Sequence, residues 1–259
     1  VITFPNRQVM IIDAGGEAFL PIDVWKRVLI PYFRQQRIKK LDIAVLSHPH
    51  PDHFGGFSSL FQVLPPKVFW HSGQTTRHPQ YRKLRKSLRA QAIPLRTFRR
   101  PQTFSFGEAR VEVLHPFPGP HEGRTYYWAR HANDNSLVLR IIYRDFRILF
   151  TGDIEERAEE ILLERKLDLR ADILKVPHHG SRTSSTLPFL KKVRPRDAIA
   201  SLGRYNAFRF PHKRTRQHLK QQKIRFWRTD QHGMIRVTTH GHQYKIQTFL
   251  KKPFPYTPN

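Results

Sequence analysis

The chain has 259 residues, with 46 Lys or Arg and 20 Asp or Glu, so its formal net charge at pH 7 is +26. Hydrophobic residues make up 39%. That share suits a globular domain with a substantial core, and no apolar run approaches the roughly 20 residues that a membrane span needs. The absence of cysteine excludes disulfides and thiolate metal sites. The excess of positive charge indicates a polyanionic partner, although a generally basic proteome or a need for solubility would also produce it.

The N-terminal region is predicted to begin with a buried strand over Val9–Ile12, followed by a tight Asp-Ala-Gly-Gly turn. Asp13, in this turn, either orients a metal-binding histidine or is an ordinary turn residue. A helix is predicted over 23–38, and Pro31 can kink it.

The densest cluster of metal-type ligands is the hexapeptide His48-Pro49-His50-Pro51-Asp52-His53. A strand over 41–46 precedes it, and apolar residues at helical spacing follow it. The cluster is therefore expected at the carboxyl end of a strand, where active sites of α/β proteins collect. Side chains two apart in an extended segment point the same way, so His48 and His50 can grip one ion. The alternative is a histidine-rich surface loop.

Basic residues concentrate in two blocks, 77–110 and 191–225. In the first, a helix with Tyr81, Leu84 and Leu88 on its buried face is expected to present basic residues to phosphates, or simply to solvent. In the second, Pro211 is expected to open a helix with His212 at its start. The residues predicted to bind nucleic acid are Arg82, Arg85, Arg89, Lys213, Arg214 and Arg216.

Other chemistry-bearing residues follow predicted strands. An apolar hairpin, 136–143 and 146–150, leads to Asp153, and a strand over 171–176 leads to His178-His179. A helix is predicted over 154–166 and another over 183–193, with a strand over 197–202 between the latter and the Pro211 helix. The aromatic residues of 116–132 could stack on bases but more often such rings cover a core edge. Residues 1–250 are expected to form one domain, and 251–259 a proline-rich disordered tail.

Together these motifs resemble the metallo-β-lactamase superfamily of dinuclear hydrolases. The HxHxDH hexapeptide and Phe150-Thr151-Gly152-Asp153 carry that resemblance. The segments 133–139 and Leu174–Ser181 are similar to the ComEC branch, the hydrolase-like domain of a bacterial DNA-uptake channel. The resemblance covers about 9–240 and implies an α/β (α+β) fold, an αββα two-sheet sandwich.

The resemblance also implies roles for individual residues. His48 and His50 would hold one divalent ion, Asp52 and His53 the other, and Asp153 would bridge them, with Mn²⁺ expected and Zn²⁺ as the alternative. His179 is expected as a ligand and His178 as a phosphate contact or proton donor. His212 is a ligand or a leaving-group acid. The predicted catalytic residues are Asp52, His178 and His212.

The chain departs from the family pattern at three positions. His50 stands where many ComEC relatives carry aspartate, and Phe210 replaces a histidine often found before Pro211-His212. The third-motif histidine of the lactamases has no clear counterpart, although Asn133 and His131 stand near that place.

The function expected from the resemblance is a metal-dependent deoxyribonuclease that degrades the non-imported DNA strand during natural competence. The alternatives are a phosphodiesterase on a smaller or cell-wall substrate and a DNA-binding module with a vestigial site. The expected partners are single- or double-stranded DNA and the membrane channel of the same full-length protein, with no small-molecule cofactor. The chain is thus expected to be a soluble piece of a bacterial inner-membrane protein on the extracytoplasmic face.

Overall fold

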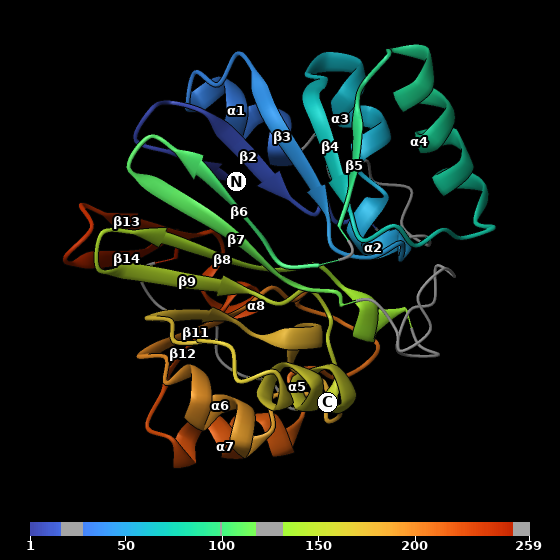
Figure 1. Cartoon of the computed structure of the whole chain (residues 1–259). Helices are drawn as coiled ribbons and strands as arrows, with labels where there is room; N and C mark the ends of the chain where they lie inside the picture. The colour runs from blue at the N-terminus through green and yellow to red at the C-terminus, as the bar shows by residue number, and fades with distance from the viewer. Residues whose placement is uncertain (17–27, 99, 118–131, 251–259) are drawn as a thin grey trace. The chain divides into compact units, whose positions relative to one another are not determined.

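The computed structural model describes residues 1–16, 28–98, 100–117 and 132–250. The chain divides into two compact units, of which unit 1 comprises Val1–Gln102 and His115–Leu137 and unit 2 comprises Thr103–Leu114 and Val138–Asn259. Each unit contains one main β-sheet with helices (Figure 1). The predicted α/β fold with two main sheets is therefore confirmed.

Unit 1 is built on a five-stranded sheet in the order β1-β2-β3-β4-β5. Strands β2 to β5 are parallel, and β1 is antiparallel to β2. Every residue of β3 is buried, as expected for a central parallel strand covered on both faces. The bounds are β1 Ile2–Thr3, β2 Val9–Ile12, β3 Leu41–Leu46, β4 Pro66–His71 and β5 Leu95–Thr97.

The helices of unit 1 pack their apolar faces on this sheet. Tyr81, Leu84 and Leu88 are the buried residues of α4, as the sequence predicts, and they join a core that includes Phe57 and Phe69. The bounds are α1 Ile30–Gln35, α2 Pro51–Phe54, α3 Phe57–Val63 and α4 Pro79–Ala90, with a 3₁₀ turn at Asn133–Asn135.

Unit 2 is built on a seven-stranded sheet in the order β12-β11-β10-β9-β8-β7-β6. The predicted apolar hairpin is present as antiparallel β8 and β9, and β9 to β12 are parallel. The bounds are β6 Gln102–Phe106, β7 Ala109–His115, β8 Val138–Tyr143, β9 Phe146–Phe150, β10 Ile173–Lys175, β11 Asp197–Ala200 and β12 Arg225–Arg228. A small antiparallel sheet, β13 Ile235–Thr239 and β14 Tyr244–Thr248, completes this unit.

The helices of unit 2 are α5 Glu156–Glu164, α6 Leu187–Val193, α7 Lys213–Gln221 and α8 Thr229–His232. Helix α6 begins later than the predicted 183–193 helix because Ser185 has φ +59° and Thr186 caps the helix by accepting a hydrogen bond from Phe189. Helix α7 begins after His212 rather than at Pro211, since His212 itself is the capping residue.

Other predictions have mixed outcomes. Residues 23–27 of the predicted 23–38 helix lie outside the described residues, and α1 covers Ile30–Gln35, with Pro31 in its first turn, where proline is tolerated. Most of the 116–132 aromatic segment and the 251–259 tail lie outside the described residues. Within the described ranges, no helix is long and apolar enough to cross a membrane.

Candidate metal centre

The histidine loop, residues 47–53, lies in unit 1 where β3 ends and α2 begins. His48 and His53 are buried, His50 is half-buried, and the side chain of Asp52 is about half exposed. Pro51 stands in the first turn of α2, where its missing N–H costs nothing. The loop thus places two imidazoles inside the unit and leaves a carboxylate toward solvent.

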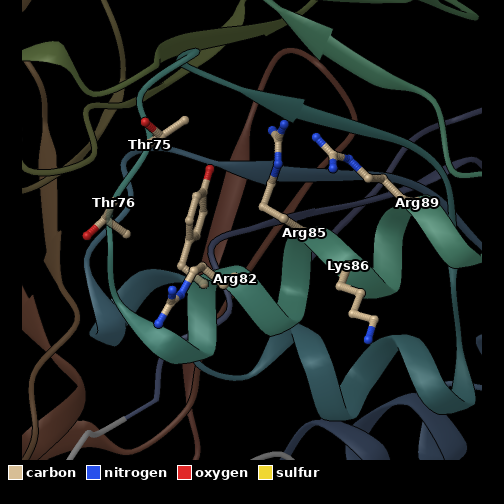
Figure 2. A pocket seen from close by; sticks show the side chains of 7 residues that line it. Thr75, Thr76, Arg82, Arg85, Lys86 and Arg89 are labelled. Carbon is tan, nitrogen blue, oxygen red and sulfur yellow. The ribbon is translucent and has the colours of Figure 1, made fainter.

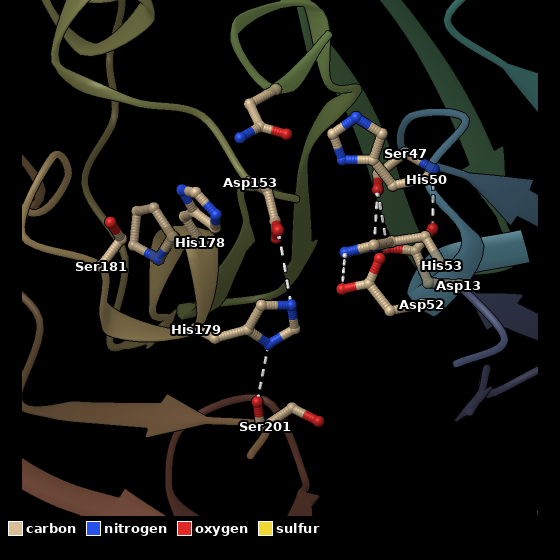
Figure 3. Close-up of polar contacts among 12 residues, drawn as sticks. Asp13, Ser47, His50, Asp52, His53, Asp153, His178, His179, Ser181 and Ser201 are labelled. Atoms are coloured by element: carbon tan, nitrogen blue, oxygen red, sulfur yellow. Dashed lines mark hydrogen bonds and ion pairs between the residues drawn. The ribbon is translucent and has the colours of Figure 1, made fainter. Parts of the chain in front are cut away.

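Asp13 and Ser47 fix the orientation of two of these imidazoles (Figure 3). The Ser47 hydroxyl donates to Asp13 Oδ2 at 2.7 Å, and the Nδ1 atom of His53 lies 2.8 Å from the same oxygen. Because the carboxylate can only accept, His53 Nδ1 is the donor and Nε2 carries a lone pair. The single hydroxyl hydrogen of Ser47 is used on Asp13, so the Nδ1 atom of His48, 3.1 Å from Ser47 Oγ, donates and its Nε2 also carries a lone pair.

The remaining ligand atoms of the loop are close to one another. His48 Nε2 lies 3.0 Å from His50 Nδ1, and His53 Nε2 lies 3.6 Å from Asp52 Oδ2. Two ligands at about 2.1 Å from a tetrahedral ion are about 3.4 Å apart, so each pair is near the spacing that one ion requires. Imidazole and carboxylate donors without sulfur suit Zn²⁺, Mn²⁺ or Fe²⁺.

The Asp-Ala-Gly-Gly turn after β2 holds Asp13 under the loop through close backbone contact. Gly56 donates to the Gly15 carbonyl, and Ala14 donates to the His53 carbonyl. A Cβ atom at Gly16 would lie 2.8 Å from Gly55 Cα, and the φ of Gly16 is +118°. Only glycine allows that φ together with so close a contact between the two backbones. The glycine therefore lets the turn pack against the end of α2.

In unit 2, Asp153 and His179 lie together. Asp153 follows β9 and is buried, and His179 Nε2 lies 3.4 Å from its Oδ2 atom. The Nδ1 atom of His179 lies 2.7 Å from the Ser201 carbonyl oxygen at the end of β11 (Figure 3). A carbonyl only accepts, so Nδ1 carries the proton and the Nε2 lone pair faces the carboxylate side. This pair of donors also fits a divalent cation.

His178 points to a different partner. Its Nδ1 atom lies 2.9 Å from Glu155 Oε1, and Glu155 also accepts from the Thr183 hydroxyl. His178 and His179 have φ of 43° and 53°, and Gly180 follows with φ +88°. Consecutive non-glycine residues in this region are strained. This backbone conformation points the two neighbouring imidazoles in different directions, so that His179 faces Asp153 and His178 faces Glu155.

The remaining predicted site residues make other contacts or lie outside the described residues. His212 is exposed, and its Nδ1 atom accepts from the Arg214 amide as the cap of α7, although its own amide donates to the Gly180 carbonyl. Asn133 begins the 3₁₀ turn of unit 1. Two residues after that turn, the Leu137 amide donates a hydrogen bond to the Ser47 carbonyl at 2.9 Å. His131 lies outside the described residues.

The first group of basic residues lies on α4, where side chains surround an open hollow of about 450 Å³ (Figure 2). Arg85 is half-buried, and its charge acts on both Tyr81 and His71. Burial and then Arg85 lower the pKa of His71 to about 4, so His71 is neutral at pH 7 and adds no charge. The hollow is lined by Thr75, Thr76, Tyr81, Arg82, Arg85, Lys86 and Arg89.

The second group lies on α7 and is partly committed within the chain. Arg214 donates to the Arg182 carbonyl at 3.2 Å and lies 3.8 Å from Glu156. Lys213 is exposed, and Arg216 is half-buried. Of this predicted trio, Lys213 is therefore the residue most available to a partner.

Three groups that orient the candidate ligands are not among the site residues predicted from the sequence. Ser47 directly precedes the hexapeptide, and a hydroxyl beside three imidazoles is a detectable signal. The position of Glu155 near the start of a helix indicates only a favourable interaction with the helix dipole, whereas its carboxylate pairs with His178. The backbone carbonyl of Ser201 leaves no signal in the sequence.

Comparison with known proteins defines the class. The sequence profile of the metallo-beta-lactamase superfamily matches residues 1–204, so the chain belongs to that superfamily, a group of hydrolases. It is 28% identical over 268 residues to ComE operon protein 3 of Bacillus subtilis (strain 168), covering 97% of this chain and 32% of the relative.

Two further relatives bear related names. Competence protein ComA of Neisseria gonorrhoeae is 28% identical, with 87% of this chain and 30% of the relative covered. Recombination protein 2 of Haemophilus influenzae is 29% identical, with coverages of 88% and 26%. The chain thus spans a third or less of the length of these relatives. Among solved structures, the metallo-beta-lactamase fold protein YhfI from Bacillus subtilis matches with a TM-score of 0.47 and 16% identity, covering 85% of this chain and 83% of that one.

Proposed function

We propose that this chain is a metal-dependent deoxyribonuclease domain that hydrolyses DNA phosphodiesters. The observation that carries the proposal is the fixed orientation of His48, His53 and His179, each of which uses Nδ1 as a donor within the chain and so presents the Nε2 lone pair. Backing of one ring nitrogen by a carboxylate, hydroxyl or carbonyl is a usual feature of metal-binding histidines. The charge of +26 supports a polyanionic substrate.

The residues that would hold the ions are those of the histidine loop together with Asp153 and His179. We propose that His48 and His50 hold one ion, that Asp52 and His53 hold a second, and that Asp153 joins the two, with His179 as a further ligand. Bound divalent ions, with Mn²⁺ favoured over Zn²⁺, would supply a water of lowered pKa and charge for the oxygens of the phosphodiester.

The chain's own groups then position the substrate and move protons. Asp52, half exposed, can accept a proton from the attacking water. His178, held by Glu155, can contact a phosphate oxygen or give a proton to the leaving group. The Nδ1 atom of His212 accepts from the Arg214 amide, so its Nε2 atom carries the proton and can take the latter role.

Basic residues would bind the flanking phosphates. Arg82, Arg85 and Arg89 surround the hollow on α4, and Lys213, Arg214 and Arg216 begin α7. Each phosphate that the protein neutralises releases condensed counterions, so removing one basic partner should make the slope of log affinity against log salt shallower by about 0.7 to 0.9. A salt titration of metal-free protein with each trio changed to alanine measures the contribution of each helix. Unchanged slopes in both variants would leave the basic residues as a solvated surface.

The deciding experiment is cleavage of labelled single- and double-stranded DNA by the whole chain, with EDTA or with added Mn²⁺, Zn²⁺ or Mg²⁺. EDTA should abolish cleavage and Mn²⁺ should restore it better than Mg²⁺, which binds imidazole poorly. Undiminished cleavage in excess EDTA contradicts the proposal. DNA binding without cleavage under any metal favours a DNA-binding module, and hydrolysis confined to small phosphodiesters favours the smaller-substrate enzyme.

The names and lengths of the relatives support a role for this activity in DNA uptake. One relative is called a competence protein and another a recombination protein, and the relatives are about three times as long as this chain. We propose that this domain works beside a membrane channel formed by the rest of a longer protein. On the extracytoplasmic side of that channel it would degrade the strand that is not imported.

A further inference from the structure

Residues 203–210 lie within the segment that joins β11 to α7, and we call them the aromatic loop. Aromatic and arginine side chains are interspersed along this loop. Tyr205 is 81% exposed and Phe208 is 77% exposed, the two highest values for large hydrophobic side chains among the described residues. Leaving such rings in water forfeits the free energy that burial would provide. Two of them on one short loop indicate a surface built for contact.

The loop is held in this conformation by Asn206. The side-chain Nδ2 atom of Asn206 donates to the carbonyls of Gly203 and Phe210. Its Oδ1 atom accepts from the backbone amide of Phe210 at 2.7 Å. Arg209 takes φ +55° within this turn. The exposed rings are therefore displayed by a loop with its own hydrogen bonds, so little conformational entropy is lost when a partner binds.

The rings are arranged in a series that reaches the candidate site of unit 2. Phe208 is stacked on Phe210, with centroids 5.5 Å apart and planes 18° apart, and Phe210 meets the His178 ring edge at 5.6 Å. Arg204 lies over the Tyr205 ring at 5.7 Å. The loop thus combines flat apolar faces, guanidinium groups and a contact with His178.

The charge around the loop selects the class of partner. No Asp or Glu occurs between Asp197 and Asp230, while Arg and Lys recur throughout that interval. A strand of unpaired nucleotides offers both features that this surface matches, because bases stack on aromatic rings and phosphates pair with arginines. Base pairs in a duplex hide those faces.

We propose that the aromatic loop is a stacking platform for unpaired bases, with Tyr205 and Phe208 as the stacking residues, so that the domain prefers single-stranded nucleic acid. This inference deepens the proposed nuclease function and rests on it for its biological meaning. It is tested without metal, so the two can fail separately. Cleavage could be absent while the base preference is present, or the reverse.

The experiment compares a labelled oligothymidylate with an abasic strand of the same length, which has the same phosphates and no bases. Metal-free wild-type protein should bind the oligothymidylate more tightly, and Tyr205→Ala with Phe208→Ala should remove that preference. Each ring should contribute roughly fivefold to 150-fold in affinity. The affinity for the abasic strand and the salt slope should stay unchanged, because both depend on the phosphates.

Two controls complete the test. Phe249→Ala removes a ring that is 72% exposed outside the loop and should keep the wild-type preference, while Tyr205→Phe and Phe208→Tyr, which keep aromatic faces, should retain it as well. Equal wild-type affinity for the two strands, or a preference that survives in the double alanine variant, overturns the proposal. Binding to vesicles of phosphatidylglycerol that the double variant loses, with strand preference intact, would overturn it in favour of a membrane contact.

Discussion

The two groups of histidines reach comparable donor arrangements by different means. In the histidine loop of unit 1, a carboxylate and a hydroxyl orient the rings, with Asp13 bonded to both Ser47 and His53. In unit 2 the backbone does this work, through left-handed φ at His178 and His179 and the Ser201 carbonyl. Side-chain networks can be altered one atom at a time, whereas strained backbone cannot. The first group should therefore tolerate graded substitutions and the second should respond more abruptly.

The largest effect is expected from Asp153→Ala. Asp153 is buried at the end of β9 and lies beside His179. If it joins two ions, its loss should prevent the pair from assembling and lower cleavage by about 100-fold or more, the order expected when a central electrostatic group is removed. The measurements are initial rates and metal content of the purified protein.

The matched control is Asp145→Ala, at the turn of the same hairpin, whose exposed carboxylate contacts His242. That variant should keep both activity and metal. A near wild-type rate with unchanged metal content in Asp153→Ala would show that Asp153 does not bridge.

A sharper comparison comes from the adjacent histidines. His179→Ala should lose metal, because its Nε2 lone pair faces Asp153, while His178→Ala should keep metal and lower kcat, because His178 pairs with Glu155. General acid–base groups typically contribute about 10²- to 10⁴-fold. Metal content and the pH profile of kcat separate the two roles. Equal metal loss in both variants would mean that the turn acts as one unit.

In unit 1, Asp13→Asn tests the orienting network without removing a ligand. An amide NH₂ replaces one carboxylate oxygen, so the position can no longer accept from the Ser47 backbone amide at one oxygen and from the Ser47 hydroxyl and His53 Nδ1 at the other, as Asp13 does. Metal affinity should fall about 10- to 100-fold, as for other partners of metal-binding histidines. A direct metal titration of the apoprotein provides the measurement, with thermal unfolding as the check on folding. Unchanged affinity would show that His53 needs no such support.

The sequence predicts the histidine loop of unit 1 better than the histidine group of unit 2. The hexapeptide lies within one loop, so its place after β3 and before α2 follows from local patterns. Asp13 is 34 residues from Ser47 and becomes its neighbour through parallel pairing of β2 with β3, which is why its role stayed open. The sequence Pro177-His178-His179-Gly180 contains no pattern that predicts left-handed φ angles at His178 and His179. Strand β5 escaped prediction because it has three residues, all of them exposed, and β6 because Phe106 is its only buried residue.

The smallest effect is expected at the carboxylate that supports the second group, Glu159 of α5. It is fully buried and accepts from the Ser185 amide and from the Thr186 amide and hydroxyl, and so holds the segment that follows the His178-His179 turn. Burial raises the pKa of Glu159 from 4.5 to about 7, although these donors act in the opposite direction. The folded chain therefore binds more protons than the unfolded chain between these two pH values. The contribution is fully present below about pH 4.5 and is lost as pH rises through about 7. Urea unfolding of metal-free protein across this range should show the free energy of unfolding falling for wild type relative to Glu159→Gln, whose amide does not titrate. Parallel curves for the two proteins would mean that the three donors keep Glu159 ionised, and the support beneath the second group would then be as insensitive to pH as its strained backbone.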